Sequence, residues 1–188
     1  TGEFVQKNPN TTVRVVKALI RASYWLDENS NANRPEAVKI IARPAYVGAD
    51  ETVIASSMTG TFEFEKGDKR PIPDFNKFFR GQYGIPYYSD AIWWLTQMRR
   101  WGHITEHKPD SWYLETAQKA FRPDIYAAPG KQLLGYGVME ASACPCLHDA
   151  TLIKAPQAGP LDGIVFDGTQ PNVYLDSFAI VLKGSAQP

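Results

Sequence analysis

A short polar and aromatic stretch, Tyr87-Tyr88-Ser89-Asp90, precedes the most tryptophan-rich part of the chain. Pro86 disfavours helical conformation for the residue before it, and Ser89 is a residue type that caps helices. Two phenols and a hydroxyl beside the free amide groups of a helix N-terminus are the donors that a small anion needs. The stretch therefore predicts a binding site for a small solute, with Ser89 as the N-cap. Packing between elements is an equally good explanation of the two tyrosines.

The helix predicted after this stretch is the most aromatic element of the chain. Trp94, Met98 and Trp101 are spaced i, i+4 and i+7, so they share one face. Gly102 is placed to end the helix in left-handed geometry. Because large apolar side chains are usually buried, the spacing predicts that this face packs into the core.

The sequence gives little evidence of a catalytic site. The chain has no G-x-S-x-G, H-E-x-x-H, P-loop or dinucleotide-binding motif. His103 and His107 are four residues apart, but they lie between Gly102 and Lys108-Pro109, which favours a surface loop over a helix carrying metal ligands. The sequence thus predicts no enzyme, no metal and no cofactor. A metal-assisted hydrolase that uses the two histidines is the enzymatic alternative.

Composition narrows the possible partners. The 188 residues carry 20 basic and 20 acidic side chains, so no strong field favours nucleic acid or an anionic membrane. No run of 18 apolar residues predicts a membrane span. The cysteines are Cys144 and Cys146, with His148 nearby, and they lack the second ligand pair of a structural zinc site. They are predicted to be free thiols or a local disulfide.

The remaining elements are predicted from periodicity and from capping residues. A helix from Asn10 or Thr11 to Asp27 is expected to bury a stripe of Val13, Val16, Ile20 and Tyr24. Further helices are expected after Pro35, Asp50, Asp74, Asp110 or Ser111, and Pro123, and the one after Asp50 is expected to bury Val53, Ile54 and Met58. Alternation over Thr61–Glu65, followed by Gly67-Asp68, predicts a short strand or extended arm with a turn, buried on its phenylalanine side. No linker divides the chain, so residues 1–188 are predicted to form a single unit.

Several segments in order along the chain resemble one known family. They are Asn8-Pro9-Asn10, Trp25-Leu26-Asp27, Ala42-Arg43-Pro44-Ala45-Tyr46, Thr59-Gly60-Thr61-Phe62-Glu63-Phe64, the stretch from Tyr87 to Gly102 with its W-W-L-T-x-x-x-R-W-G pattern, Phe121-Arg122-Pro123-Asp124-Ile125-Tyr126 and Asp162-Gly163-Ile164-Val165-Phe166-Asp167. This set is similar to the nitrate/bicarbonate branch of the periplasmic substrate-binding proteins of ABC transporters.

The resemblance implies a fold and a location for the chain. The fold expected is α/β and helix-rich, the C-terminal half of a two-lobed periplasmic-binding-protein-like architecture. Residues 1–188 would supply the second lobe and the C-terminal tail, and the first lobe would be absent from this chain. The protein would work in the periplasm, or at the membrane on the outer side of the inner membrane.

The resemblance also implies ligand-binding residues. Gly60, which precedes the phenylalanine strand, would let backbone amides approach the solute, although a strand-entering turn also explains a glycine there. Tyr88 stands where nitrate binders of the family commonly have lysine, so it offers one hydrogen bond and no positive charge. Tyr87, Ser89 and Thr61 would add donors.

The function implied is that of the solute-binding component of an ABC importer. It would hold nitrate or a related small anion between two lobes and deliver it to the permease in the membrane, without chemical change. The alternative is a ligand-sensing module, either in a nitrate-type regulator or fused to a transporter ATPase.

Overall fold

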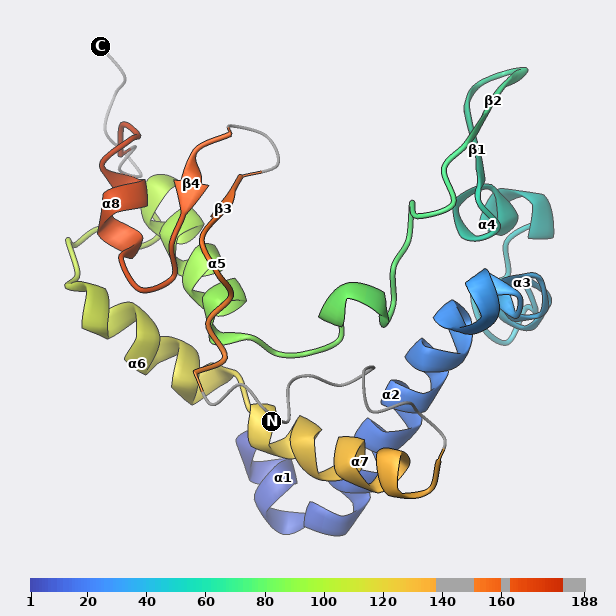
Figure 1. The fold of residues 1–188 in the computed structure, drawn as a ribbon, viewed down its shortest axis with the longest axis horizontal. Helices are drawn as coiled ribbons and strands as arrows, with labels where there is room; N and C mark the ends of the chain where they lie inside the picture. Colours follow the sequence, from blue (N-terminus) through green and yellow to red (C-terminus); the bar gives the residue numbers. More distant parts are fainter. Residues whose placement is uncertain (138–150, 160–162, 181–188) are drawn as a thin grey trace. The chain divides into compact units, whose positions relative to one another are not determined.

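The computed structural model describes residues 1–137, 151–159 and 163–180, and their contacts group into two compact units (Figure 1). Of the described residues, unit 1 holds 1–84 and 127–137, and unit 2 holds 85–126, 151–159 and 163–180. Where the sequence predicted one unit, the contacts thus form two. The assignment of the chain to a second lobe and tail stays a prediction. Cys144, Cys146, His148 and Asp162 lie outside the described residues.

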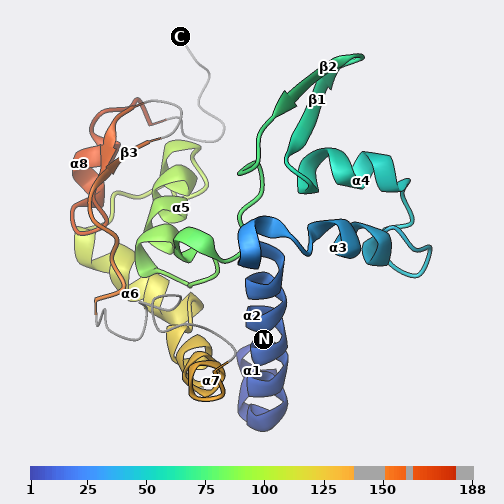
Figure 2. The same cartoon turned by 45° about the vertical axis from the view of Figure 1, so that its right-hand side comes forward.

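Unit 1 is built mainly from helices. Its elements are α1 (Gly2–Lys7), α2 (Pro9–Asn31), α3 (Arg34–Ile41), α4 (Glu51–Met58), β1 (Thr61–Glu65), β2 (Asp68–Pro71), the short 3-10 helix η1 (Arg80–Gln82) and the part of α7 (Pro123–Gly135) that follows Tyr126. Figure 2 shows α3 and α4 beyond the C-terminal end of α2, with the β1–β2 hairpin next to α4.

Several of these boundaries follow from local chemistry, but α2 begins earlier than predicted, because Asn10 and Thr11 lie inside it and Asn8 is its N-cap. Pro9 occupies the first turn of α2, where its missing N–H is not needed. The regular dihedral angles of α2 stop at Asp27, because Glu28 is extended and Asn29 and Ser30 have positive φ. The Asp50 carboxylate accepts a 2.8 Å hydrogen bond from the Thr52 amide and caps α4. Three predicted helices are therefore confirmed here, since α3 also begins beside Pro35.

Burial differs from the predicted pattern in parts of unit 1. In the stripe of α2 only Ile20 is fully buried, and Val53 of α4 is 64% exposed. The predicted turn at Gly67 is present, and the chain returns from it as β2, which pairs antiparallel with β1 and was not predicted. Phe64 stays exposed, while Phe62 stacks on Phe75 with ring centroids 4.6 Å apart. A two-stranded ribbon outside a larger sheet has only one shielded face, so half of its apolar side chains remain in contact with solvent.

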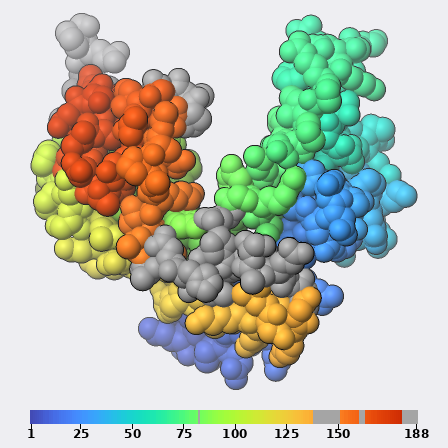
Figure 3. All heavy atoms as spheres, in the orientation of Figure 1, coloured from blue at the N-terminus to red at the C-terminus, as the bar shows by residue number. Residues whose placement is uncertain are grey.

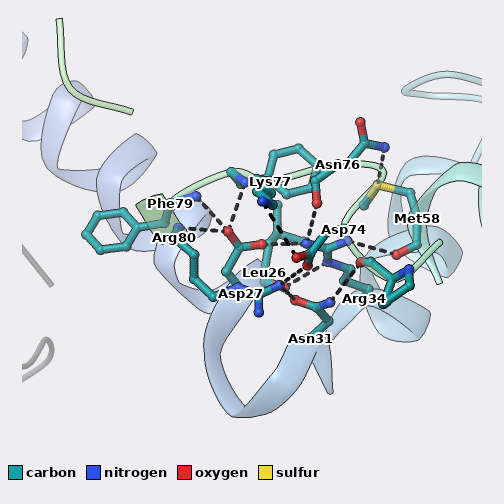
Figure 4. Close-up of polar contacts among 12 residues, drawn as sticks. Leu26, Asp27, Asn31, Arg34, Met58, Asp74, Asn76, Lys77, Phe79 and Arg80 are labelled. Carbon is teal, nitrogen blue, oxygen red and sulfur yellow. Dashed lines mark hydrogen bonds and ion pairs between the residues drawn. The ribbon is translucent and has the colours of Figure 1, made fainter. Parts of the chain in front are cut away.

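The helix predicted after Asp74 does not form, and a buried ion pair explains the geometry found instead (Figure 4). One carboxylate oxygen of Asp27 accepts hydrogen bonds from three successive amides, those of Phe78, Phe79 and Arg80, at 2.9, 2.7 and 3.0 Å. These bonds hold the three amides toward Asp27, and the segment adopts turns and then η1.

Arg34 completes this network from the start of α3. Its guanidinium donates to the second oxygen of Asp27 at 2.6 Å and to the carbonyl oxygens of Leu26, Met58 and Asn76 at 3.1, 3.2 and 2.7 Å. The side chains of Asp27 and Arg34 are 2% and 1% exposed. A buried pair with its hydrogen bonds satisfied therefore joins the ends of α2 and α4 to residues 76–80.

Unit 2 has an apolar and aromatic core. Its elements are α5 (Tyr88–Arg100), α6 (Asp110–Ala120), the first residues of α7, β3 (Gln157–Ala158), β4 (Val165–Phe166) and α8 (Pro171–Leu175). The core consists of Ala91, Ile92, Tyr113, Ala117, Phe166, Tyr174 and Leu175. In Figure 3 the orange and red residues of 151–180 form a layer that hides most of α5 from this side.

The buried face of α5 is not the predicted one. Trp94, Met98 and Trp101 are 56%, 44% and 55% exposed, whereas Ile92 and Thr96 are fully buried. The prediction that the tryptophan face packs into the core is therefore wrong for the described residues. The opposite face carries smaller side chains that let α6 and α8 approach closely, and this packing decides the orientation of the helix.

The ends of the helices in unit 2 follow their sequence signals more closely. Gly102 has φ +74° and ends α5 in left-handed geometry as predicted, with the His103 amide donating to Met98 at 2.9 Å. The helices after Asp110 and Pro123 are also confirmed. Within the described ranges, no helix combines the length and the apolar character needed to cross a membrane.

Candidate functional site

The N-terminal end of α5 lies two residues earlier than predicted. Tyr87 is the N-cap, Tyr88 begins the helix, and no side chain caps it, so the assignment of Ser89 as the N-cap is wrong. Ser89 lies inside the first turn, where its hydroxyl accepts a 3.1 Å hydrogen bond from the Lys154 amide. The Tyr88 amide in turn donates to the Leu152 carbonyl oxygen at 2.9 Å. Residues 152–154 therefore hold the start of the helix.

Burial separates the three predicted residues of this stretch. Tyr87 and Ser89 are both 3% exposed, while Tyr88 is half-buried. A Cβ added to Gly168 would lie 3.1 Å from the Ser89 Cβ, so the chain packs tightly against that serine. Tyr88 is thus the one of the three whose side chain reaches solvent to any extent. Tyr87 and Ser89 support the position of the helix start.

Two cations lie beside this helix start, and sequence reasoning identified neither. The Lys154 ammonium is 2.7 and 2.8 Å from the two oxygens of Asp90, and it lies 4.9 Å from the centroid of the Tyr87 ring. Lys154 is 64 residues from Asp90 in the chain, so no local spacing indicated the pair. Its side chain and that of Asp90 are partly exposed.

The second cation is Arg122, which precedes α7. Its side chain forms an exposed two-bond ion pair with Asp124, the shorter bond being 2.5 Å. This carboxylate raises the pKa of Arg122, and the nearby Tyr88 phenol adds a smaller effect in the same direction. Arg122 hydrogen bonding in return lowers the pKa of Asp124. Arg122 therefore supplies a positive charge near residue 88, although residue 88 itself is a tyrosine and not a lysine.

A further phenol is close to the buried Tyr87. Burial, with a smaller contribution from the Tyr87 phenol, raises the pKa of Tyr126 to about 12. Tyr126 therefore stays protonated at neutral pH and keeps a hydrogen to donate. Tyr126 lies in the first turn of α7. The sequence predicted this helix but gave no sign that it lies close to Tyr87.

The other two predicted residues belong to unit 1. Gly60 has φ +87°, and a Cβ there would come within 3.3 Å of the Pro73 Cα, so the turn into β1 requires a glycine. Thr61 lines a groove of about 520 Å³ beside α4, together with Thr52, Val53, Ala55, Ser56, Thr59, Glu63 and Lys69. The structure thus brings Gly60 and Thr61 together in one unit and Tyr87, Tyr88 and Ser89 together in the other.

The groove at Thr61 offers hydroxyl groups and one cation. The Thr52, Ser56 and Thr59 hydroxyls donate to Asp50 or to backbone carbonyl oxygens of α4, so each keeps acceptor capacity. Lys69 lies 3.7 Å from Glu63, an exposed and weak pairing. This arrangement suits hydrogen bonding to a small polar solute and provides no nucleophile with an adjacent base.

The histidines show no sign of a metal site in the described part of the chain. His103 and His107 are exposed and lie in the loop between α5 and α6, as predicted. No group of three or more histidine, cysteine, aspartate or glutamate side chains is arranged to hold a metal among the described residues.

Comparison with known proteins finds related sequences over nearly the whole chain. Residues 1–42 match the NMT1-like family. The nitrate import ATP-binding protein NrtC of Synechocystis sp. is 30% identical over 95% of this chain, which covers 24% of that protein. The bicarbonate-binding protein CmpA of Synechococcus elongatus is 26% identical over 95% of this chain and 39% of its own length.

The fold is also that of a known binding protein. The crystal structure of the periplasmic nitrate-binding protein NrtA from Synechocystis PCC 6803 matches with a TM-score of 0.79 and 21% identity, over 96% of this chain and 44% of that one. The chain spans about a quarter to two fifths of the length of the two relatives named above. The predicted α/β, periplasmic-binding-protein-like fold is confirmed. In sequence and in fold, this chain is related to the nitrate/bicarbonate-type substrate-binding proteins.

Proposed function

We propose that this chain is part of the solute-binding component of an ABC importer. The protein holds nitrate or a related small anion between two lobes and delivers it unchanged to a membrane permease, on the outer side of the inner membrane. The observation that carries the proposal is the similarity over 95% of the chain to a bicarbonate-binding protein, together with the fold of a nitrate-binding protein. Binding proteins of this kind close by hinge motion and catalyse no reaction.

The half-buried Tyr88 is the proposed solute contact in unit 2. Its phenol can donate one hydrogen bond, and Arg122 supplies positive charge nearby. An exposed ion pair such as Arg122–Asp124 is weak in water, so an incoming anion can compete for the guanidinium. Tyr87 and Ser89 act by positioning the start of α5. Thr61, with Gly60 shaping the turn, is the proposed contact in unit 1.

The test is the affinity of the whole binding protein for nitrate, measured by calorimetry. Tyr88→Ala is expected to weaken binding at least tenfold, about 1.4 kcal/mol, because a donor in contact with the solute is lost. Tyr88→Phe separates the hydroxyl from the packing of the ring. Arg122→Gln is expected to weaken binding of nitrate and bicarbonate, and to leave binding of an uncharged solute unchanged.

A matched control removes a cation that lies far along the chain. Arg43→Gln deletes one exposed positive charge in unit 1 and should leave the affinity unchanged. Unchanged affinity in Tyr88→Ala would remove that residue from the site. A thermal-shift screen of nitrate, nitrite, bicarbonate, sulfonates and small aromatic acids identifies the solute, because a bound ligand raises the unfolding temperature. A screen without any hit would contradict the proposal of an anion binder.

A second candidate function is a ligand-sensing module within a transporter ATPase or a nitrate-type regulator. The observation that favours it is the 30% identity to NrtC, whose name describes an ATP-binding protein and of which this chain matches 24%. The two functions can be distinguished by the other domains or signals encoded in the same polypeptide. A nucleotide-binding domain encoded with this chain favours the sensor, and a secretion signal favours the importer.

A further inference from the structure

A groove in unit 1, remote in sequence from the proposed solute contacts, combines positive charge with aromatic walls. It has a volume of about 550 Å³ and is lined by Arg14, Lys17, Ala18, Arg21, Ala22, Trp25, Leu133 and Tyr136. The first six residues lie on one face of α2, and the other two lie on α7 and directly after it. The size falls within the range of ligand-binding pockets.

The charge of the groove is unbalanced. Arg14, Lys17 and Arg21 follow one another at i, i+3 and i+7, and none of the described residues that line the groove is a carboxylate. Within the described part of the chain, Arg14 and Arg21 form no ion pair or side-chain hydrogen bond. Lys17 is held by a 3.2 Å hydrogen bond to Gln132 and lies 4.4 Å from the centroid of the Tyr136 ring, so its charge is not neutralised either. The chain as a whole has a net charge of zero, so the positive charge of this groove does not reflect a general excess of basic residues.

The remaining lining is apolar or aromatic. Ala18 and Ala22 have only a methyl group as side chain, so they leave open space on the helix surface between the cations. Tyr136 is 71% exposed, and the Lys17 ammonium lies over its ring, so the exposed part of the ring is available for stacking. Guanidinium groups bind carboxylates through two parallel hydrogen bonds and also stack on flat rings.

We propose that this groove binds a small organic anion that carries two acidic groups on a flat aromatic body. The acidic groups pair with Arg14 and Arg21, and the ring lies over Ala18 and Ala22 beside Tyr136. The separation of the two arginines by two helical turns, about 10.5 Å of rise, matches a ligand with its acidic groups at opposite ends. The proposal does not depend on the identity of the transported solute.

The test is calorimetry of the full chain with naphthalene-2,6-dicarboxylate. We expect binding at least tenfold tighter than that of inorganic sulfate, which has the charge without the ring, and of naphthalene-2-carboxamide, which has the ring without the charge. The double variant Arg14→Gln/Arg21→Gln is expected to weaken binding at least tenfold. Both side chains are exposed, so the fold is retained, as circular dichroism will verify. Tyr136→Ala is expected to weaken binding of the dicarboxylate severalfold.

A second double variant controls for net charge. Lys39→Gln/Arg43→Gln removes two exposed positive charges elsewhere in unit 1 and is expected to leave binding unchanged. The proposal is overturned if Arg14→Gln/Arg21→Gln binds the dicarboxylate as well as the parent chain does. It is also overturned if sulfate binds equally tightly, if both double variants weaken binding alike, or if an acidic peptide binds more tightly than the dicarboxylate.

Discussion

The two units are stabilised around different kinds of centre. Unit 1 has at its centre a charged pair, Asp27 and Arg34, beside a small apolar cluster of Ala37, Val38 and Met58. Unit 2 is built around a larger aromatic cluster that includes Ile92, Tyr113 and Tyr174. Among the described residues Asp27 is the buried carboxylate of the chain, and it lies in unit 1. An apolar core tolerates small shifts, whereas a buried ion pair requires its partners in one geometry.

This difference explains why irregular backbone is found where it is. In unit 1, residues 76–80 adopt turns because their amides and a carbonyl group bind Asp27 and Arg34. In unit 2, helices pack directly on helices and the chain needs no charged anchor. The comparison predicts that single substitutions will affect the two units unequally.

The largest effect is expected from removing one partner of the buried pair. Arg34→Ala leaves the Asp27 carboxylate buried without its cation and removes the hydrogen bonds from Arg34 to three carbonyl oxygens, so unit 1 should lose about 3–5 kcal/mol of stability. Urea unfolding, with amide hydrogen exchange to separate the units, measures the loss. The exposed Arg43→Ala is the matched control. A loss below about 1 kcal/mol would contradict the importance of the pair.

A smaller effect is expected from acid. Burial by itself raises the pKa of Asp27, but hydrogen bonds from Phe79, Arg80, Arg34 and Phe78 together outweigh it and lower the pKa below the usual range. A carboxylate with a lowered pKa stabilises the fold above its unfolded pKa of about 3.9, and this contribution is lost as pH falls through the folded value.

Unit 1 is therefore expected to lose stability below about pH 4 before unit 2 does. Hydrogen exchange or urea unfolding at a series of pH values measures this for each unit. Asp27→Asn, which cannot ionise, should flatten the pH dependence of unit 1 although it is less stable at neutral pH. An unchanged slope in that variant would assign the acid sensitivity to other carboxylates.

The smallest effect is expected in unit 2, and its sign is opposite. The Tyr113 hydroxyl is fully buried and has no hydrogen-bond partner among the described residues, and burial raises its pKa. An unsatisfied buried polar group is destabilising, so Tyr113→Phe should raise the stability of unit 2 by about 1 kcal/mol. The urea midpoint measures the change. Tyr174→Phe is the comparison, since that hydroxyl accepts hydrogen bonds from Gln97 and Arg100 and its loss should destabilise.

The sequence predicted the parts of the fold that depend on neighbouring residues. Asp50 caps α4, Gly102 ends α5, and Gly67 lies in the hairpin turn, because each of these roles is decided within a few residues. The family resemblance also rested on local motifs, and the comparisons confirm it.

The predictions that were wrong concern features that depend on residues distant in the sequence. Asp27 contacts residues 51 to 53 positions away, so nothing near Asp74 revealed that the expected helix there would be replaced by turns. Periodicity identified an apolar face on α5 but could not decide which face meets the core, and packing selected the side with Ile92 and Thr96. Lys154 and Arg122 were missed at the candidate site because each approaches it from another segment.

The distribution of indole rings has an optical consequence. Trp93, Trp94, Trp101 and Trp112 all belong to unit 2, which leaves Trp25 as the one tryptophan of unit 1. Light emitted by the chain on excitation near 295 nm therefore reports mainly on unit 2, with a long-wavelength share from the exposed Trp94 and Trp101. A melting curve recorded by emission alone would follow one half of the molecule, and Trp25→Phe would scarcely alter its amplitude.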